Sequence, residues 1–356
     1  MAQSCHPPIL TQVTNAVKGF LNLIITLCVL GLSRPCVAVE LEHPNVTIAV
    51  GGKATLYYLP LSLAEHLGYF KDEGLNVEIN DFQGGSKSLQ AMIGGSADVV
   101  AGAFEHNIVM QTLAQKMTAF VLIAMNPGVS VGVVKAKAAG YRSPLGLKGM
   151  RVGVTAPGSG THMIINHLLA SAGLTPDDII PVGVGTGATA IAAIRSGELD
   201  AICNVEPAMT LLEQQGLITI VHETITDKGT FKVFGGSIPA GTLYTKQSFM
   251  QKNPNTVQAL ANAMVRALVW LSKATPEEVV KVVPPEYLLG DRALYLSALK
   301  RLKPTYSKDG LMPQRGVDQA YKVLQSTNQA VRRAPVLFLQ QTFDNSFAQR
   351  AFEKFH

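Results

Sequence analysis

The chain is poor in the residues that mark disulfide scaffolds and nucleic-acid-binding surfaces. Only four of its 356 residues are cysteine, one is tryptophan, and 15% are charged. So few cysteines exclude a disulfide scaffold in a chain of this length. The net charge of +5 comes without a long basic run, which argues against a nucleic-acid partner or a polybasic membrane surface. A hydrophobic fraction of 47% excludes a disordered chain.

Acidic residues are absent before Glu40, and this region holds the longest apolar run, Phe20 to Leu32. Its 13 residues fall short of the roughly 20 that cross a bilayer. Lys18 precedes the run, and Cys36 and Ala38 follow it in small-x-small spacing. This layout predicts a signal peptide over residues 1–38, cleaved near Ala38, and export of the protein. A buried N-terminal helix is the alternative.

Cleavage there would remove three cysteines and leave Cys203 alone, inside the apolar segment 201–205. We expect Cys203 to be an inert buried thiol, because a reactive thiolate needs a polar, accessible setting. No H-x-x-x-H, C-x-x-C or G-x-S-x-G pattern occurs in a suitable context. The sequence therefore predicts no catalytic residue, no metal site and no cofactor.

One order of strands, glycine turns and helices occurs twice. The expected strands cover 45–50, 77–79 and 99–103, and then 151–154, 179–184 and 201–205. At an offset of 102 residues, Gly85 corresponds to Gly187 and Asp98 to Asp200. Alternating strands and helices predict mostly parallel sheets with right-handed crossovers. The fold class is therefore α/β, with two similar lobes.

The rest of the chain is helical, and its apolar spacing predicts helices over 255–273, 292–300 and 315–328, with a further helix starting at Thr275. We expect these helices to pack on the first lobe. The chain would then cross between lobes near 126–131 and 230–237. The predicted domains are a first lobe of residues 39–128 plus 236–356 and a second lobe of residues 129–235.

Four glycine-containing turns follow strands, at 51–57, 84–86, 158–162 and 185–189. Ligands of open parallel sheets bind at the carboxyl ends of the strands. Glycine lets a ligand approach the backbone, and a helix N-terminus offers free N–H groups to anionic oxygens. Ser86 and Ser159 have a simpler interpretation as ordinary N-caps. Four turns in equivalent places favour a ligand cleft between the lobes.

Charged and aromatic residues near these turns are further candidates. Lys53 could pair with an anionic ligand or remain a solvated turn lysine. Glu105, His106 and Glu206 follow the strands 99–103 and 201–205, where acidic residues also compensate helix N-terminal charge. Tyr57 could stack on a ring or donate its hydroxyl.

A dinucleotide-binding pattern, G-x-G-x-x-G/A, occurs over residues 183–188, and Glu206 lies near the place of an acidic ribose contact. We disfavour this interpretation because an exported protein meets little NAD. The internal repeat already accounts for the glycines.

Several segments together resemble a known family: LPLSLAEHLGYFKDEGLNVEI (59–79), QGGSKSLQAMIGGSADVV (83–100), LKGMRVGVTAPGSGTHMIINHLLASAGLTPDDI (147–179) and SGELDAICNVEPA (196–208). They are similar to the periplasmic solute-binding proteins of ABC importers, in the branch for sulfonates, taurine, nitrate and thiamine-pyrimidine precursors. The resemblance implies a type II-like fold whose two lobes close on a ligand and then dock on a membrane permease.

The turns and the resemblance together predict one set of ligand-binding residues: Lys53, Thr55, Tyr57, Gly85, Ser86, Glu105, His106, Ser159, Gly160, Thr161, His162 and Glu206. Two acids at such a cleft would favour a zwitterion or an amine-bearing ring over a simple anion. We expect a monomer with a small-molecule ligand, a permease partner and no nucleic acid.

The same superfamily includes a thiamine-pyrimidine synthase with a cysteine-rich motif. The chain lacks that motif, which argues against the enzyme. Two alternatives stay open: an exported enzyme on the same fold, and a binding protein that serves a sensor in place of an importer.

Overall fold

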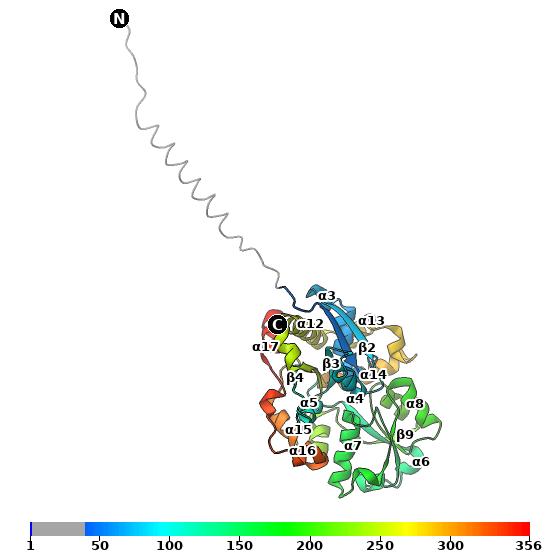
Figure 1. Cartoon of the computed structure of the whole chain (residues 1–356). Coiled ribbons are helices and arrows are strands. Elements are labelled where there is room, and N and C mark those ends of the chain that lie inside the picture. The colour runs from blue at the N-terminus through cyan, green and yellow to red at the C-terminus, as the bar shows by residue number, and fades with distance from the viewer. Residues whose placement is uncertain (2–39) are drawn as a thin grey trace. The chain divides into compact units, whose positions relative to one another are not determined.

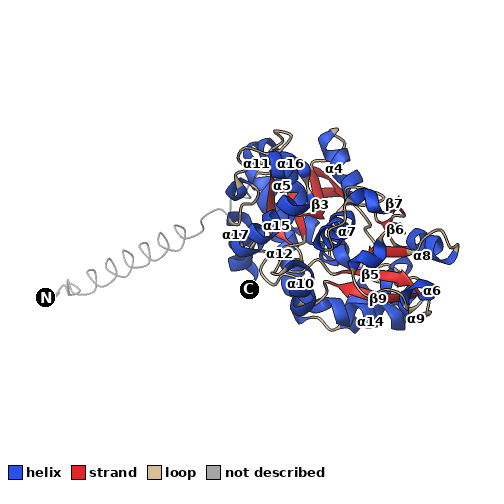
Figure 2. Ribbon diagram, turned by 90° about the horizontal axis from the view of Figure 1, so that it is seen from below, coloured by secondary structure: helices blue, strands red, loops and turns tan. Residues whose placement is uncertain are grey.

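The strands form two five-stranded sheets of identical topology, ordered β2-β1-β3-β10-β4 and β7-β6-β8-β5-β9 (Figure 1). Figure 2 shows the strands in two separate groups, each with helices around it. The first sheet contains β1 (Asn45–Val50), β2 (Asn76–Asp81), β3 (Val99–Ala103), β4 (Met117–Leu122) and β10 (Gly241–Lys246). The second contains β5 (Val129–Val134), β6 (Arg151–Val154), β7 (Ile180–Gly183), β8 (Ala201–Val205) and β9 (Ile218–Glu223).

This computed structural model describes Met1 and residues 40–356. The expected signal peptide otherwise lies outside the described residues. Over the described part of the chain, no helix combines the length and the apolar character that a membrane span requires.

Strand direction follows the same rule in both sheets. β1 pairs in parallel with β2 and β3, whereas β10 is antiparallel to β3 and β4. In the second sheet β6 is parallel to β7 and β8, and β5 is antiparallel to β8 and β9. The one reversed strand of each sheet is the strand that arrives from the other sheet. The prediction of an α/β fold with mostly parallel sheets is confirmed.

The internal repeat has a direct structural counterpart. The Asp98 carboxylate accepts a hydrogen bond from the Thr47 N–H in β1 at 2.9 Å. At the equivalent place, the Asp200 carboxylate accepts from the Arg151 N–H in β6 at 2.8 Å. Asp98 thus ties β3 to the neighbouring parallel strand β1, and Asp200 ties β8 to the neighbouring parallel strand β6.

Two segments connect the sheets. The first runs from β4 to β5, so residues 129–131, expected to lie in the crossing, already belong to a strand. The second runs from β9 to β10 and contains the helix α10 (Asp227–Phe234). Pro127 of the first crossing and Ala240 of the second lie near the glycine-containing turns that follow the strands.

The helices near the first sheet and its strand ends are α2 (Leu59–His66), α3 (Tyr69–Asp72), α4 (Gly85–Ile93), α5 (Glu105–Gln111), α11 (Gln247–Lys252) and α12 (Pro254–Lys273). Those that follow strands of the second sheet are α6 (Lys135–Ala138), α7 (Gly160–Ser171), α8 (Gly187–Arg195) and α9 (Ala208–Gln214). The C-terminal helices are α13 (Pro276–Val282), α14 (Arg292–Leu302), α15 (Gln314–Thr327), α16 (Gln329–Arg333) and α17 (Ser346–Phe355).

The molecule has two halves, the first built on the sheet of β1–β4 and β10 and the second on the sheet of β5–β9. The long helix α12 and the C-terminal helices contact elements of both halves. The long helix α12 packs against α17, α2 and β4, with Leu260, Met264 and Leu268 almost fully buried. In contrast, α14 contacts α9, and α15 contacts both α5 and α7. The second half is therefore held by the C-terminal helices as well as by the two crossings.

The start of α13 confirms the expected capping residue. Thr275 and Glu278 form a capping box, in which the Glu278 N–H donates to Thr275 Oγ1 at 3.2 Å and the Thr275 N–H donates to Glu278 Oε2 at 2.7 Å. We expect Thr275→Ala to lower the free energy of unfolding by about 1 kcal/mol, because one helix N–H loses its acceptor. Urea unfolding checks this, with Thr275→Ser as the matched control that keeps the hydroxyl. Equal loss in both variants would contradict the capping role.

Candidate functional site

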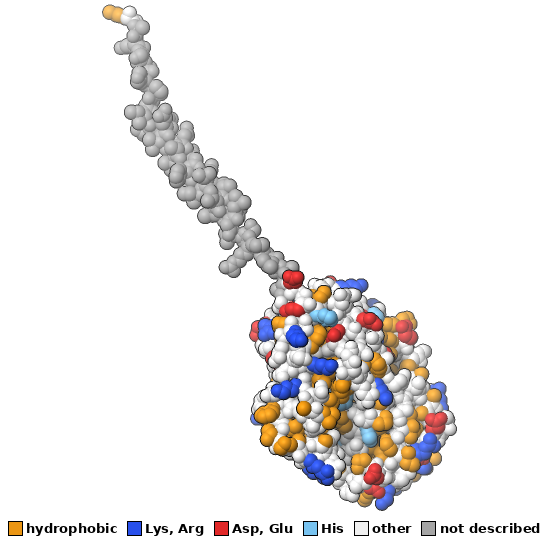
Figure 3. Space-filling model, in the orientation of Figure 1, with side chains coloured by type: hydrophobic (Ala, Val, Ile, Leu, Met, Phe, Trp, Pro, Cys, Tyr) orange, Lys and Arg blue, Asp and Glu red, His pale blue; other side chains and the backbone are white. Residues whose placement is uncertain are grey.

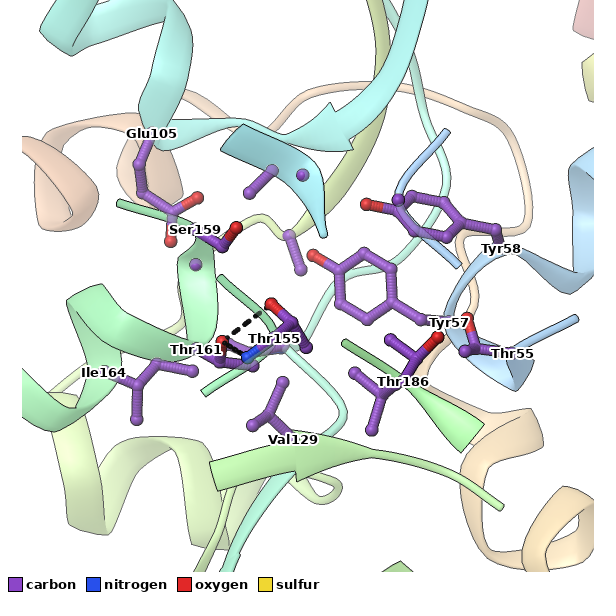
Figure 4. Close-up of a pocket in the computed structure, with 17 residues that line it drawn as sticks. Thr55, Tyr57, Tyr58, Glu105, Val129, Thr155, Ser159, Thr161, Ile164 and Thr186 are labelled. Carbon is purple, nitrogen blue, oxygen red and sulfur yellow. Dashed lines mark hydrogen bonds between the residues drawn. The ribbon is translucent and has the colours of Figure 1, made fainter. Parts of the chain in front are cut away.

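A cavity of about 40 Å³ lies between the turns that follow the strands of the two sheets (Figure 4). The first half contributes the segment after β1, the start of α4 and the start of α5. The second half contributes the segment from β6 into α7 and the turn before α8. The lining residues are Gly51, Thr55, Tyr57, Tyr58, Gly85, Ala103, Glu105, Pro127, Val129, Thr155, Ser159, Gly160, Thr161, Ile164, Thr186, Val205 and Ala240.

Glycine allows the two halves to approach closely around this cavity. A Cβ on Gly84 would lie 2.9 Å from the Cβ of Ala156, and a Cβ on Gly52 would lie 2.8 Å from Oγ1 of Thr186. Both glycines have a positive φ, +97° at Gly84 and +108° at Gly52, which other residues rarely adopt. The glycine turns therefore fit a closed arrangement of the halves.

Hydrogen bonds also join the halves beside the cavity. The Ser86 N–H donates to Ser159 Oγ at 3.0 Å, and the Ser86 hydroxyl donates to the Pro157 carbonyl at 2.9 Å. The Leu56 N–H donates to the Glu206 carbonyl at 3.0 Å. Ser86 and Ser159 thus bond across the boundary, and neither side chain caps its own helix.

The N-terminus of α7 faces the cavity. Thr161 Oγ1 accepts from the Thr155 N–H at 3.0 Å and lies 2.9 Å from the Thr155 hydroxyl, the interactions drawn as dashes in Figure 4. The N–H groups of Gly160 and Thr161 begin the helix and have no acceptor within it. Together with the helix dipole, they make this side of the cavity suited to an electron-rich ligand group.

Two tyrosines form another wall. The rings of Tyr57 and Tyr58 meet edge to face, with centroids 4.7 Å apart, and Figure 4 shows both hydroxyls directed toward the cavity. Burial raises the pKa of both hydroxyls, so they stay protonated at neutral pH and can donate hydrogen bonds. Aromatic walls with polar ends suit a small organic solute.

Glu105 is the acidic group of the cavity. Its Oε2 is buried and has no hydrogen-bond partner among the described residues. Burial raises the pKa of this carboxyl to about 7, although a bond from its own backbone N–H lowers it. An unpaired buried carboxyl is costly to keep, which is typical of a functional group.

His106, the next residue, points elsewhere. Its Nδ1 lies 3.1 Å from the Tyr244 hydroxyl and its Nε2 lies 3.3 Å from the Gly158 carbonyl. Burial lowers the pKa of this imidazole to about 4, so His106 is neutral at pH 7. It supports the Gly158 turn from behind and does not line the cavity.

Glu206 also lies outside the lining. Its side chain is 1% exposed, and its Oε2 accepts from the Thr210 N–H at 2.9 Å. Arg301 of α14 approaches its other oxygen at 3.9 Å and bonds to Glu223 at 2.9 Å. Burial raises the pKa of Glu206, and the hydrogen bonds from Thr210 and then the Arg301 charge partly oppose this. The side chain thus fixes α9 and α14, while its carbonyl holds Leu56.

The remaining predicted residues also divide into those that line the cavity and those that lie outside it. Lys53 pairs with Glu65 at 2.8 Å, and His162 Nδ1 accepts from the Gly158 N–H at 3.0 Å, so both lie behind the turns. The structure brings seven predicted residues into the lining: Thr55, Tyr57, Gly85, Glu105, Ser159, Gly160 and Thr161. It leaves five outside: Lys53, Ser86, His106, His162 and Glu206.

Some lining residues were not on the predicted list. Thr155 immediately follows the expected strand 151–154, and Thr186 lies inside an expected turn, so position alone could have suggested both. Val129 begins β5 and Ala240 lies in the second crossing, directly before β10, and neither belongs to a local motif.

The described part of the chain holds neither an accessible cysteine nor a cluster of metal-binding side chains. Cys203 is fully buried in β8, and burial raises the pKa of its thiol. No cluster of three or more His, Cys, Asp or Glu residues suited to a metal occurs among residues 40–356.

Figure 3 shows basic and acidic side chains interspersed on the visible face.

Comparison with known proteins identifies the family. The model of the NMT1-like family matches residues 41–283. The chain belongs to the NMT1-like family. A solved structure from Bordetella bronchiseptica RB50 is 48% identical, has a TM-score of 0.85, and aligns over 88% of this chain and 99% of its own.

More distant structures share the fold. The alkanesulfonate-binding protein SsuA from Xanthomonas axonopodis pv. citri is 18% identical, with a TM-score of 0.66 over 86% of this chain and 100% of its own. The periplasmic nitrate-binding protein NrtA from Synechocystis PCC 6803 is 16% identical, with a TM-score of 0.67 over 88% and 90%. The predicted resemblance to periplasmic binding proteins, and the predicted fold class, are confirmed.

A protein of another kind is also similar to this chain. The 4-amino-5-hydroxymethyl-2-methylpyrimidine phosphate synthase of Aspergillus parasiticus is 27% identical over 253 residues, 67% of this chain and 71% of its own. The NMT1-like chain is thus similar both to binding proteins and to this synthase.

Proposed function

We propose that this protein is the substrate-binding component of an ABC importer and that it acts in the periplasm. It captures a small sulfonate, taurine-like, nitrate-like or aminopyrimidine solute and delivers it to a membrane permease. The binding lobes are residues 39–128 plus 236–356 and residues 129–235, with the ligand between them. The likeness to the sulfonate- and nitrate-binding proteins supports this class of ligand.

The observation that carries the proposal is the composition of the cavity wall. Both halves supply hydroxyl groups to it: Thr55 and Tyr57 from the first, and Thr155, Ser159 and Thr161 from the second. A solute that bonds to both sets stabilises the closed state relative to an open one, because an open state offers only one set at a time.

The size of the cavity fits capture by closure. A single water needs roughly 10–15 Å³ of such space, so about 40 Å³ holds only a few water-sized groups. A solute enters when the halves separate and is then enclosed. The bonds between Ser86 and Ser159 join the two halves beside the cavity and accompany this closure.

The synthase likeness motivates the alternative of an enzyme on the same fold. A binding role is favoured because the cavity wall lacks a paired nucleophile and base. Ser159 Oγ bonds to Ser86, and the two nearby histidines bond to the Gly158 backbone behind the wall. Chemical turnover of a bound solute by the purified protein would support the enzyme.

A thermal-shift panel tests the proposal. We expect at least one solute among taurine, alkanesulfonates, nitrate and aminopyrimidines to raise the melting temperature by several degrees. A ligand at 100 times its Kd adds about 2.7 kcal/mol to the free energy of unfolding. Glucose and ribose, which carry neither an amine nor an anionic group, serve as unrelated solutes of small size. Absence of a shift with every member of the panel would contradict the proposed ligand class.

A further inference from the structure

Among the described residues that line the cavity, Glu105 is the only Asp, Glu, Lys, Arg or His. The other polar groups of this lining are hydroxyls and backbone amides. A simple anion placed here would gain partial charges from α7 but would meet a carboxyl without a neutralising cation. Carboxylate and sulfonate sites gain most from charge-assisted donors, which this wall does not supply.

The unpaired oxygen of Glu105 shows what the ligand must supply. Oε2 is buried without a hydrogen-bond partner, although neighbouring Ser159 and the tyrosines carry hydroxyls. Leaving a buried acceptor unsatisfied costs free energy that a donor from the ligand would recover. A protonated amine is the strongest such donor, because both partners of the bond then carry charge.

The wall formed by the start of α7 determines which group the ligand must carry at its other end. Figure 4 shows Thr155 and Thr161 on that wall, below Glu105 and Ser159. The free N–H groups at the start of this helix of 12 residues require an acceptor. The cavity thus offers a carboxyl acceptor in one place and amide and hydroxyl donors in another.

We infer that Glu105 is the specificity-determining residue of this cavity, and that it selects solutes joining an amine or N–H donor to an electron-rich group over anions lacking such a donor. This inference rests on the proposed function. It narrows the range of solutes to zwitterions and amine-bearing rings.

Matched pairs of solutes test the selection by Glu105. Isothermal titration compares taurine with ethanesulfonate, and 4-aminopyrimidine with pyrimidine, because each pair differs only by the amine. We expect at least one amine-bearing member to bind tenfold or more tightly than its partner, equivalent to about 1.4 kcal/mol. In Glu105→Gln this preference should fall by tenfold or more, whereas Glu353→Gln, an exposed acid on α17, should keep it.

Two results would overturn the inference. One is that no amine-bearing member binds more tightly than its partner; the other is that Glu105→Gln keeps the preference. Binding of ethanesulfonate or nitrate without any gain from an amine would remove the inference but leave the proposed function in place. Absence of binding by every solute of the panel would contradict both.

Discussion

Gly84→Ala is expected to weaken ligand binding by at least 100-fold, or about 2.7 kcal/mol. The added Cβ would lie 2.9 Å from the Cβ of Ala156 and 3.0 Å from the carbonyl carbon of Thr155, both in the other half. Neither neighbour is the end of a flexible side chain, so the halves must separate. Separation removes the Ser86–Ser159 bonds and pulls the two hydroxyl walls apart. Isothermal titration with the best solute of the panel measures the loss.

Gly95→Ala separates this effect from backbone strain. Gly84 lies directly before α4 and Gly95 lies two residues after its end, with a similar positive φ of +85°, but a Cβ on Gly95 meets nothing within 4 Å. Both substitutions should lower the free energy of unfolding by about 1–3 kcal/mol, the usual cost of a non-glycine residue in such a conformation. Only Gly84→Ala should lose affinity. Equal affinities in the two variants would show that closure at Gly84 is not needed for binding.

Glu105→Gln is expected to stabilise the free protein above pH 7, although it weakens binding. Burial raises the pKa of Glu105 from its usual 4.5 to about 7, so the folded protein holds this proton more tightly than the unfolded chain. The resulting stabilisation is complete below pH 4.5 and is lost as the pH rises through 7. The difference between the two pKa values corresponds to about 3 kcal/mol.

Glutamine does not titrate, so the variant isolates this contribution. Relative to the wild type, Glu105→Gln should gain about 3 kcal/mol in the free energy of unfolding between pH 4 and pH 8. The other groups coupled to Glu105 are Tyr57, Tyr58 and Tyr244, whose pKa values burial raises further from this range. Urea unfolding at the two pH values measures the change. A difference that is the same at both would show that Glu105 is solvated in the free protein.

The sequence predicted the local parts of the fold well. The expected strands 45–50, 99–103, 151–154 and 201–205 coincide with β1, β3, β6 and β8, because short, mostly apolar runs bounded by turn residues favour buried strands. It did not identify β4, β5, β9 and β10. β10 joins its sheet more than a hundred residues after β3, so only long-range pairing places it there.

The cavity was predictable as a set of turns but not as a set of side chains. Glycine and hydroxyl residues after strands indicated Thr55, Gly85, Ser159 and Thr161, all of which line the cavity. Glu105 and His106 are adjacent on one helix, and successive helical residues point in directions about 100° apart, so one faces the cavity and the other does not. Whether Glu105 or His106 faces the cavity depends on how α5 packs against the second half, which the local sequence does not determine.

The most direct test of the account is a crystal structure of the protein grown with the solute that gives the largest thermal shift. We predict that the solute occupies the cavity between Thr55, Glu105 and Thr161, with its donor on the Glu105 carboxyl and its acceptor at the start of α7. A solute bound elsewhere, with this cavity left unoccupied, would contradict the account.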